Sequence, residues 1–218
     1  MNYLSHFYFF NKPNTPYYNC GLVFPDWLGA YKRKRLSRNL IIETANEQEL
    51  AAGIEHHFLG DRIFHGSDYF KEHAHGIKLI LEKTSMNKDL FRFSFISHVI
   101  LEMMIDRLLL LKHPHLGTQF YDNLDACDDS QLLYFAQRNS TADDGFKTMV
   151  EKFKHYRFIL GYVNTGNFVY SLNRIIGRVG INFNESQVVE LTAVIPEIEN
   201  YIDTNWNKLF ILFDNHEK

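Results

Sequence analysis

The chain has 218 residues, of which 45% are hydrophobic and 22% are charged, a composition typical of a soluble globular protein. Its formal net charge of −3 excludes a uniformly basic surface of the kind that binds nucleic acid. No apolar run reaches the roughly 18 residues of a membrane span, no signal peptide is recognisable, and Cys20 and Cys127 match no zinc-binding spacing. We therefore expect a cytoplasmic protein with a single domain over residues 1–218.

Residues 1–10 are mostly apolar and predict a short helix that is buried nearly all round. His6 would be a polar group in this apolar setting, where one hydrogen bond within the core is a more common outcome than a catalytic role. Lys12–Pro16 predicts a turn. Pro25 suits the first turn of the next helix and places Asp26 near its start, where an aspartate can simply cap the helix.

A sharp change of charge follows. Five cations lie within seven residues, namely Lys32, Arg33, Lys34, Arg35 and Arg38. A solvated basic loop is the usual explanation of such a run. The alternative is a docking patch that binds an acidic partner, because clustered positive charge accelerates association with a negative surface.

Residues 46–75 predict one long helix, or two helices that are separated near Gly66. Asn46 followed by Glu49 resembles a capping box at the start of the helix. The apolar positions that keep helical spacing are Leu50, Ile54, Phe58, Ile63, Phe64, Tyr69 and Phe70.

The same helix carries a polar stripe. His57, Asp61 and His65 are four residues apart, so each side chain stands one turn above the last, and Asp68 and Glu72 continue the stripe. Histidines beside carboxylates at this spacing are often a solvated face. Because large apolar residues flank this stripe on both sides, a metal site or an acid/base site is an equally good interpretation.

A second helix with a similar stripe is predicted over residues 88–112, after a helix that Ser67 caps and that runs to about Lys83. Its polar residues His98, Glu102 and Asp106 are again four apart. Two helices that each carry potential ligands could face one another across a site.

The rest of the chain predicts further helices. They cover residues 128–138, 142–156, 157–179 and 185–213, and Pro196 should kink the last one. No segment alternates with a period of two, and no repeat of 20 to 50 residues is present. The predicted fold class is all-α.

Several motifs of the sequence resemble those of the acyl carrier protein phosphodiesterases. Met1–His6, MNYLSH, resembles that family's MN-(aromatic)-LAH signature, and residues 21–26, GLVFPD, resemble its GNLL-x-D segment. Residues 52–61, with AGI followed by His57 and Asp61, resemble its AGI…H-x-x-x-D segment. The similarity then continues, in order, through His98, Tyr162, Leu172, Asn173 and Arg178 into the aromatic closing helix.

The resemblance implies a helical bundle similar to that of the HD-domain metal phosphohydrolases. It further implies a hydrolase that releases 4′-phosphopantetheine from holo acyl carrier protein with a divalent metal, Mn²⁺ first and Fe²⁺ or Mg²⁺ as alternatives. Asp26, His57 and Asp61 would be catalytic, and the basic run would hold the acidic carrier protein. The metal ligands expected to converge on one pocket are His6, Asp26, His57, Asp61, His65 and His98. Mixed histidine and carboxylate ligands suit Mn²⁺ or Fe²⁺ better than Ca²⁺.

The chain departs from the family at two positions. His65 stands where the family usually has an aspartate, in D-x-x-T-D, and Ser97 stands where it usually has the aspartate of an Asp-His pair. Each change removes a carboxylate, although His65 can still ligate a metal and Glu102 or Asp106 could compensate.

Two further hypotheses accompany the hydrolase. One is a non-catalytic helical protein that keeps the fold and the basic docking patch. The other is a helical-bundle metalloenzyme of different chemistry, because histidines and carboxylates on facing helices also build redox sites.

Overall fold

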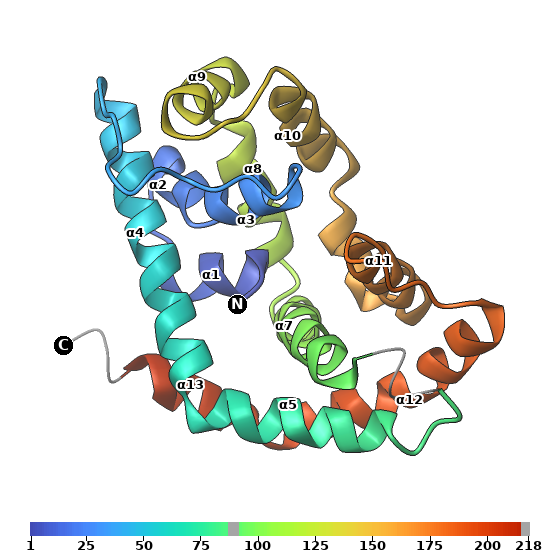
Figure 1. Cartoon of the computed structure of the whole chain (residues 1–218). Helices are drawn as coiled ribbons and strands as arrows, with labels where there is room; N and C mark the ends of the chain where they lie inside the picture. Colours follow the sequence, from blue (N-terminus) through green and yellow to red (C-terminus); the bar gives the residue numbers. More distant parts are fainter. Residues whose placement is uncertain (87–91, 215–218) are drawn as a thin grey trace. The chain divides into compact units, whose positions relative to one another are not determined.

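All regular elements of the computed structural model, which describes residues 1–86 and 92–214, are helices (Figure 1). The predicted all-α class is therefore confirmed, while the similarity to HD-domain bundles stays a prediction. The chain divides into two compact units, Met1–Arg62 with His115–Ile159 and Ile63–Pro114 with Leu160–Lys218, which we call the first and second units. The single-domain organisation also stays a prediction. Within the described residues, no helix has both the length and the apolar character that a bilayer span requires.

The first unit is built around an aromatic core. Its helices are α1 (Tyr3–Phe10), α2 (Pro16–Gly21), α3 (Phe24–Ala30), most of α4 (Ala45–Gly66), α8 (Leu116–Asp125), α9 (Asp129–Asn139) and α10 (Gly145–Tyr156). Helix α8 packs against α1, α2 and α10. Phe24 of α3 meets the rings of Phe135 and Phe146 at 5.4 and 5.6 Å between centroids. These edge-to-face contacts fix α3, which carries Asp26, against α9 and α10.

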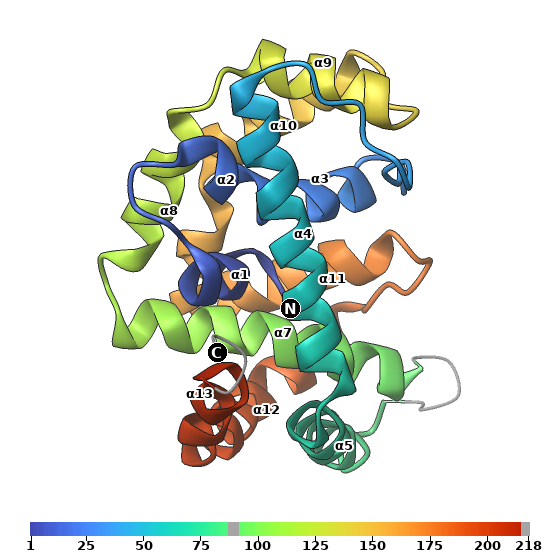
Figure 2. The same cartoon turned by 90° about the vertical axis from the view of Figure 1, so that its left-hand side faces the viewer.

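Helices α2 and α4 cross at two glycines, in the region where Figure 2 shows α2 behind α4. A Cβ added to Gly53 would lie 2.9 Å from Cα of Gly21, and a Cβ added to Gly21 would lie 2.9 Å from Cα of Gly53. The same added atoms would collide with the backbone oxygens of Tyr18 and Leu50. Only residues without a Cβ allow this approach, so the two glycines are a packing requirement of the fold.

The second unit is a set of helices around α7. It contains the end of α4, α5 (Asp68–Leu81), α7 (Phe93–Lys112), α11 (Thr165–Gly177), α12 (Glu185–Thr204) and α13 (Trp206–Asp214). Helix α7 packs against α5, α11 and α12 (Figure 1). Arg107 of α7 is buried, forms an ion pair with Glu199 of α12 at 2.7 Å, and donates a hydrogen bond to the Tyr162 carbonyl. The buried cation is thus paired, as its burial requires.

The predicted end of α4 agrees with the structure, but its predicted start does not. Helix α4 ends at Gly66, and Ser67 caps α5 by accepting a hydrogen bond from the Phe70 N–H at 3.1 Å. The expected Asn46 cap is wrong, because α4 begins at Ala45 and the Glu47 N–H donates to the Thr44 hydroxyl at 3.2 Å. Phe58, which helical spacing assigned to the core, is 48% exposed.

The second half of the chain contains more breaks than predicted. The helix expected over 157–179 is a 3₁₀ segment, Phe158–Val163, followed by α11, which Asn164 caps by accepting from the Asn167 N–H. The helix expected over 185–213 continues through Pro196 but ends at Thr204, before α13. Helix α8 was not predicted. Residues 88–91, the expected start of the α7 helix, lie outside the described part of the chain.

Candidate metal centre

Four of the expected ligands lie in the first unit, on three helices. His6 is buried in α1, Asp26 lies in the first turn of α3, and His57 and Asp61 lie one turn apart on α4. Aromatic packing of Phe24 fixes α3, and the paired glycines fix α2 against α4, which brings these helices together.

Each oxygen of the Asp61 carboxylate lies close to one of two stacked imidazole rings. The rings of His6 and His57 are 4.0 Å apart between centroids and inclined by 23°. One Asp61 oxygen lies 3.2 Å from His6 Nε2 and the other lies 3.5 Å from His57 Nε2. Asp26 approaches from the side, with Oδ1 at 3.9 Å from His57 Nε2. Metal-ligating atoms of His6, His57 and Asp61 all lie within 4.8 Å of one another.

A backbone contact orients His57. Its Nδ1 lies 2.9 Å from the Leu22 carbonyl oxygen, which can only accept, so Nδ1 must carry the proton and donate it. In neutral imidazole the lone pair is then on Nε2, the nitrogen that faces Asp61 and Asp26. This arrangement, with one nitrogen donating to a carbonyl and the other presented to a site, is typical of metal-binding histidines.

The surroundings of the site keep His6 neutral and Asp61 charged. Burial, followed by repulsion from His57, lowers the pKa of His6 from 6.5 to about 3. Burial alone would raise the pKa of Asp61, but the close contact with His6 Nε2, at 3.2 Å, and the positive charge of the Met1 amino group, 2.6 Å away, outweigh it and lower that pKa. Neutral imidazole and ionised carboxylate are the forms that bind metals.

The residues present fit a divalent ion. Neither ring nitrogen of the buried His6 makes a well-aligned hydrogen bond, which is costly for a buried polar group. A metal bond would satisfy one of these nitrogens. The side chains of Asp61 and Asp26 are 31% and 32% exposed, so the cluster is open to water on the carboxylate side. An ion bound here would take the place of the Met1 amino group at Asp61.

His65 and His98 belong to a different group. His65 lies in the last turn of α4, within the second unit, where it meets His98 and Glu102 of α7. The sequence prediction placed His57, Asp61 and His65 around one ion. An α-helix rises about 1.5 Å per residue, so His57 and His65 lie about 12 Å apart along the axis of α4. The sequence predicted that two polar stripes could face one another and placed Glu102 in the second stripe, but Glu102 was not among the six expected metal ligands.

Neither Ser97 nor the other residues of the two stripes belong to either group. Ser97 is buried and donates its hydroxyl to the Ser94 carbonyl at 3.2 Å, and Asp106 is fully buried in α7. Asp68 and Glu72 lie on the surface, where they pair with Lys71 and Lys208.

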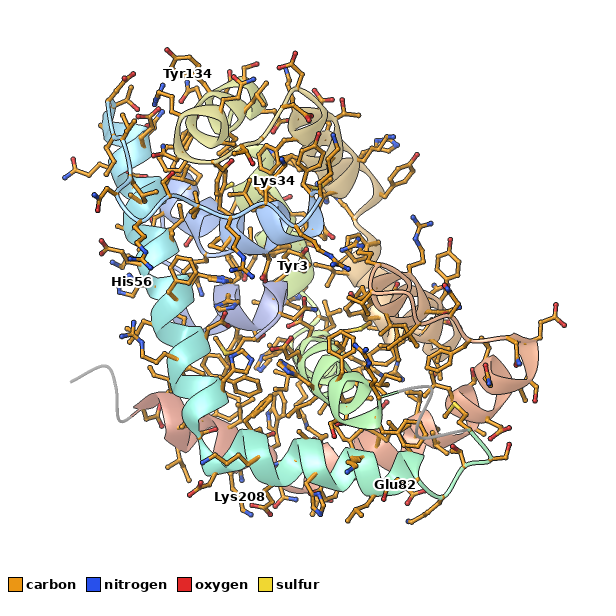
Figure 3. The ribbon with its side chains drawn as sticks, viewed as in Figure 1. Tyr3, Lys34, His56, Glu82, Tyr134 and Lys208 are labelled. Atoms are coloured by element: carbon orange, nitrogen blue, oxygen red, sulfur yellow. The ribbon has the colours of Figure 1, made fainter. Side chains whose placement is uncertain are left out.

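The basic segment 32–38 is an exposed connection after α3 in the first unit, and Lys34 is labelled in Figure 3. Lys32 is not wholly available to a partner, because it pairs with Asp143 at 2.9 Å and lies over the Tyr31 ring. Arg33, Arg35 and Arg38 are exposed. Their role in binding a partner stays a prediction.

Two surface hollows of the first unit lie elsewhere. The larger, of about 640 Å³, is lined among others by Asp129, Lys154 and Arg157. Its charged residues pair with each other, for example Lys154 with Asp129. Among the described residues, its side chains form no metal-binding group like the one at His6. We therefore assign the chemistry to the histidine cluster.

Comparisons with family models, with curated proteins and with solved structures find no match to this chain.

Proposed function

We propose that the chain is a metal-dependent phosphodiester hydrolase whose centre is formed by His6, Asp26, His57 and Asp61. The observation that carries the proposal is the convergence of two imidazoles, His6 and His57, and the ionised Asp61 carboxylate from α1 and α4, with Nδ1 of His57 donating to the Leu22 carbonyl. A cation in this ligand set supplies charge neutralisation for a phosphodiester and a lowered pKa for an attacking water.

The residues of the proposed centre have different roles, which follow from their positions. His6, His57 and Asp61 hold the ion, and the mixed nitrogen and oxygen set favours Mn²⁺ or Fe²⁺ over Mg²⁺, which prefers oxygen ligands. Asp26, on the open side and 3.9 Å from His57, is placed to complete the ligand set or to accept a proton from water.

The substrate proposed is holo acyl carrier protein, from which hydrolysis releases 4′-phosphopantetheine. The resemblance of MNYLSH, GLVFPD and the AGI segment to the acyl carrier protein phosphodiesterases supports this choice. These motifs contain all four residues of the proposed centre and the two glycines of the α2–α4 crossing, so they coincide with what the site needs.

The test is hydrolysis of holo acyl carrier protein and of bis(p-nitrophenyl) phosphate with Mn²⁺, Fe²⁺ or Mg²⁺ added. We expect turnover, and Asp26→Asn should lower kcat about 100-fold or more on both substrates. Asp68→Asn is the matched control, because Asp68 is a 99% exposed aspartate on α5, and it should retain full activity. Absence of hydrolysis with every metal would refute the proposal.

In that event, the non-catalytic alternative is favoured by one specific observation. Asp61 is already engaged by the Met1 amino group and by His6, and neither family position that lost its carboxylate adds a ligand to this cluster. A protein of this kind would keep the fold and the basic docking patch without turnover. A redox metalloenzyme would instead bind iron and consume oxygen, which an oxygen electrode measures.

A further inference from the structure

Three side chains of the second unit point at one another. His65 lies in the last turn of α4, and His98 and Glu102 are one turn apart on α7. The distances are 2.8 Å from His65 Nε2 to Glu102 Oε1, 3.1 Å from His98 Nε2 to the same oxygen, and 3.1 Å between the two nitrogens. The three atoms thus form a nearly equilateral triangle.

Hydrogen bonds cannot satisfy all three sides of this triangle. Each Nε2 carries at most one proton, and an ionised carboxylate only accepts. If both nitrogens donate to Glu102, they face each other as two donors, and if only one donates, a nitrogen lone pair faces another acceptor. One side is therefore always unfavourable, whereas a cation above the triangle would be attractive to all three atoms.

The size of the triangle matches a metal site. Nitrogen and oxygen ligands lie about 2.1 Å from Zn²⁺ and similar ions, and two such ligands at right angles are then about 3.0 Å apart. Two histidines and one carboxylate on one face of the ion, with water in the other positions, is a ligand set that divalent iron and zinc both adopt.

The surroundings hold the ligands in place and leave an entrance. The ring of Phe70 packs edge-on against His65 at 4.9 Å and His98 at 4.8 Å between centroids. Glu102 is 18% exposed, whereas His65 and His98 are 33% and 38% exposed, so the ligands are accessible from solvent. Although burial alone would raise the pKa of Glu102, hydrogen bonds from both histidines contribute to holding it well below its usual value, which leaves an ionised ligand.

We propose that His65, His98 and Glu102 bind a divalent transition-metal ion of the Fe²⁺-to-Zn²⁺ series, at a second site with its own ligands, which ties the end of α4 to α7. The site is independent of the hydrolase proposed above, because it shares no residue with the His6, His57 and Asp61 cluster. Binding there does not require turnover, and loss of turnover would not remove it.

Counting bound Zn²⁺ tests the proposal. The starting protein is the Asp61→Asn variant, in which the cluster of His6, His57 and Asp61, here the first cluster, lacks its carboxylate. This protein is dialysed against Zn²⁺ and its metal content is measured. We expect this protein to retain one tightly bound ion, and addition of His98→Gln or Glu102→Gln should weaken its binding by more than about 100-fold. The matched control is His75→Gln, an exposed histidine on α5 of the same unit, which should leave binding unchanged. Equal Zn²⁺ binding in the His98→Gln and His75→Gln proteins would overturn the proposal.

A second measurement needs no variant at these positions, in case substitution disturbs folding. His65 and His98 should react with diethyl pyrocarbonate in metal-free protein, and Zn²⁺ should protect both, while His75 remains reactive. Mass spectrometry of the digested protein locates the modified residues. Unchanged modification of His65 and His98 in the presence of Zn²⁺ would also overturn the proposal.

Discussion

At the scale of single residues, the chemistry depends on which nitrogen of each histidine is presented to the site. The Leu22 carbonyl fixes the orientation of His57, and burial lowers the pKa of His6 to about 3, so the His6 ring is uncharged at neutral pH. The spacing of His57 and Asp61 correctly predicted that they lie on one side of a helix, where His57 Nε2 and Asp61 Oδ2 are 3.5 Å apart. It could not predict the Leu22 contact, because a main-chain carbonyl has no sequence signature.

Asp61→Asn should weaken metal binding at the first cluster without unfolding the protein. The amide keeps the size of the side chain but removes the carboxylate charge that contacts both His6 and His57. We expect Mn²⁺ affinity to fall about 100-fold or more, measured by calorimetric titration. Helix content from circular dichroism should stay unchanged, and an unaltered affinity would show that Asp61 is not a ligand.

At the scale of helices, hydrophobic periodicity predicted most of the helices. Their ends are set by hydrogen bonds with capping side chains. Asn164 accepts from the Asn167 N–H and starts α11, and Asn205 donates to the Tyr201 carbonyl at the end of α12. Such local hydrogen bonds compete with the helix and can divide an apolar pattern that is otherwise continuous. The grouping of His65 with His98 and Glu102 was missed for a related reason, because the pattern gives the face of a residue but not its height along the axis.

Gly53→Ala should destabilise the first unit, because an added Cβ would collide with the backbone of α2. We expect the free energy of unfolding to fall by about 1–3 kcal/mol or more, measured by denaturant titration. Gly29→Ala is the control, since a Cβ there meets nothing within 4 Å and alanine favours a helix, so stability should stay equal or rise by about 1 kcal/mol. Equal effects of the two substitutions would show that the α2–α4 crossing can relax.

At the scale of the whole molecule, the net charge of −3 conceals a strongly basic segment. Composition excluded a uniformly basic surface but could not show which cations are paired within the protein. In the structure Lys32 pairs with Asp143, and Arg33, Arg35 and Arg38 are exposed. We therefore test a docking role for the segment on these three exposed arginines.

If the arginines hold an acidic carrier protein, reversing Arg33, Arg35 and Arg38 to glutamate should act on association. We expect kcat/KM to fall for holo acyl carrier protein and to change little for bis(p-nitrophenyl) phosphate, which makes no use of the segment. Rising salt should reproduce this selective loss in the wild type, because exposed charges are screened over about 8 Å at physiological ionic strength.

The control for this experiment is the reversal of Lys71, Lys83 and Lys208, which are exposed cations of the second unit. It changes the net charge by the same amount, so a general electrostatic effect would lower kcat/KM for the carrier protein equally in both variants. A specific docking site requires a larger loss with the arginine variant. If the arginine variant loses activity on both substrates alike, the segment acts on the catalytic centre or on folding, and the docking interpretation is wrong.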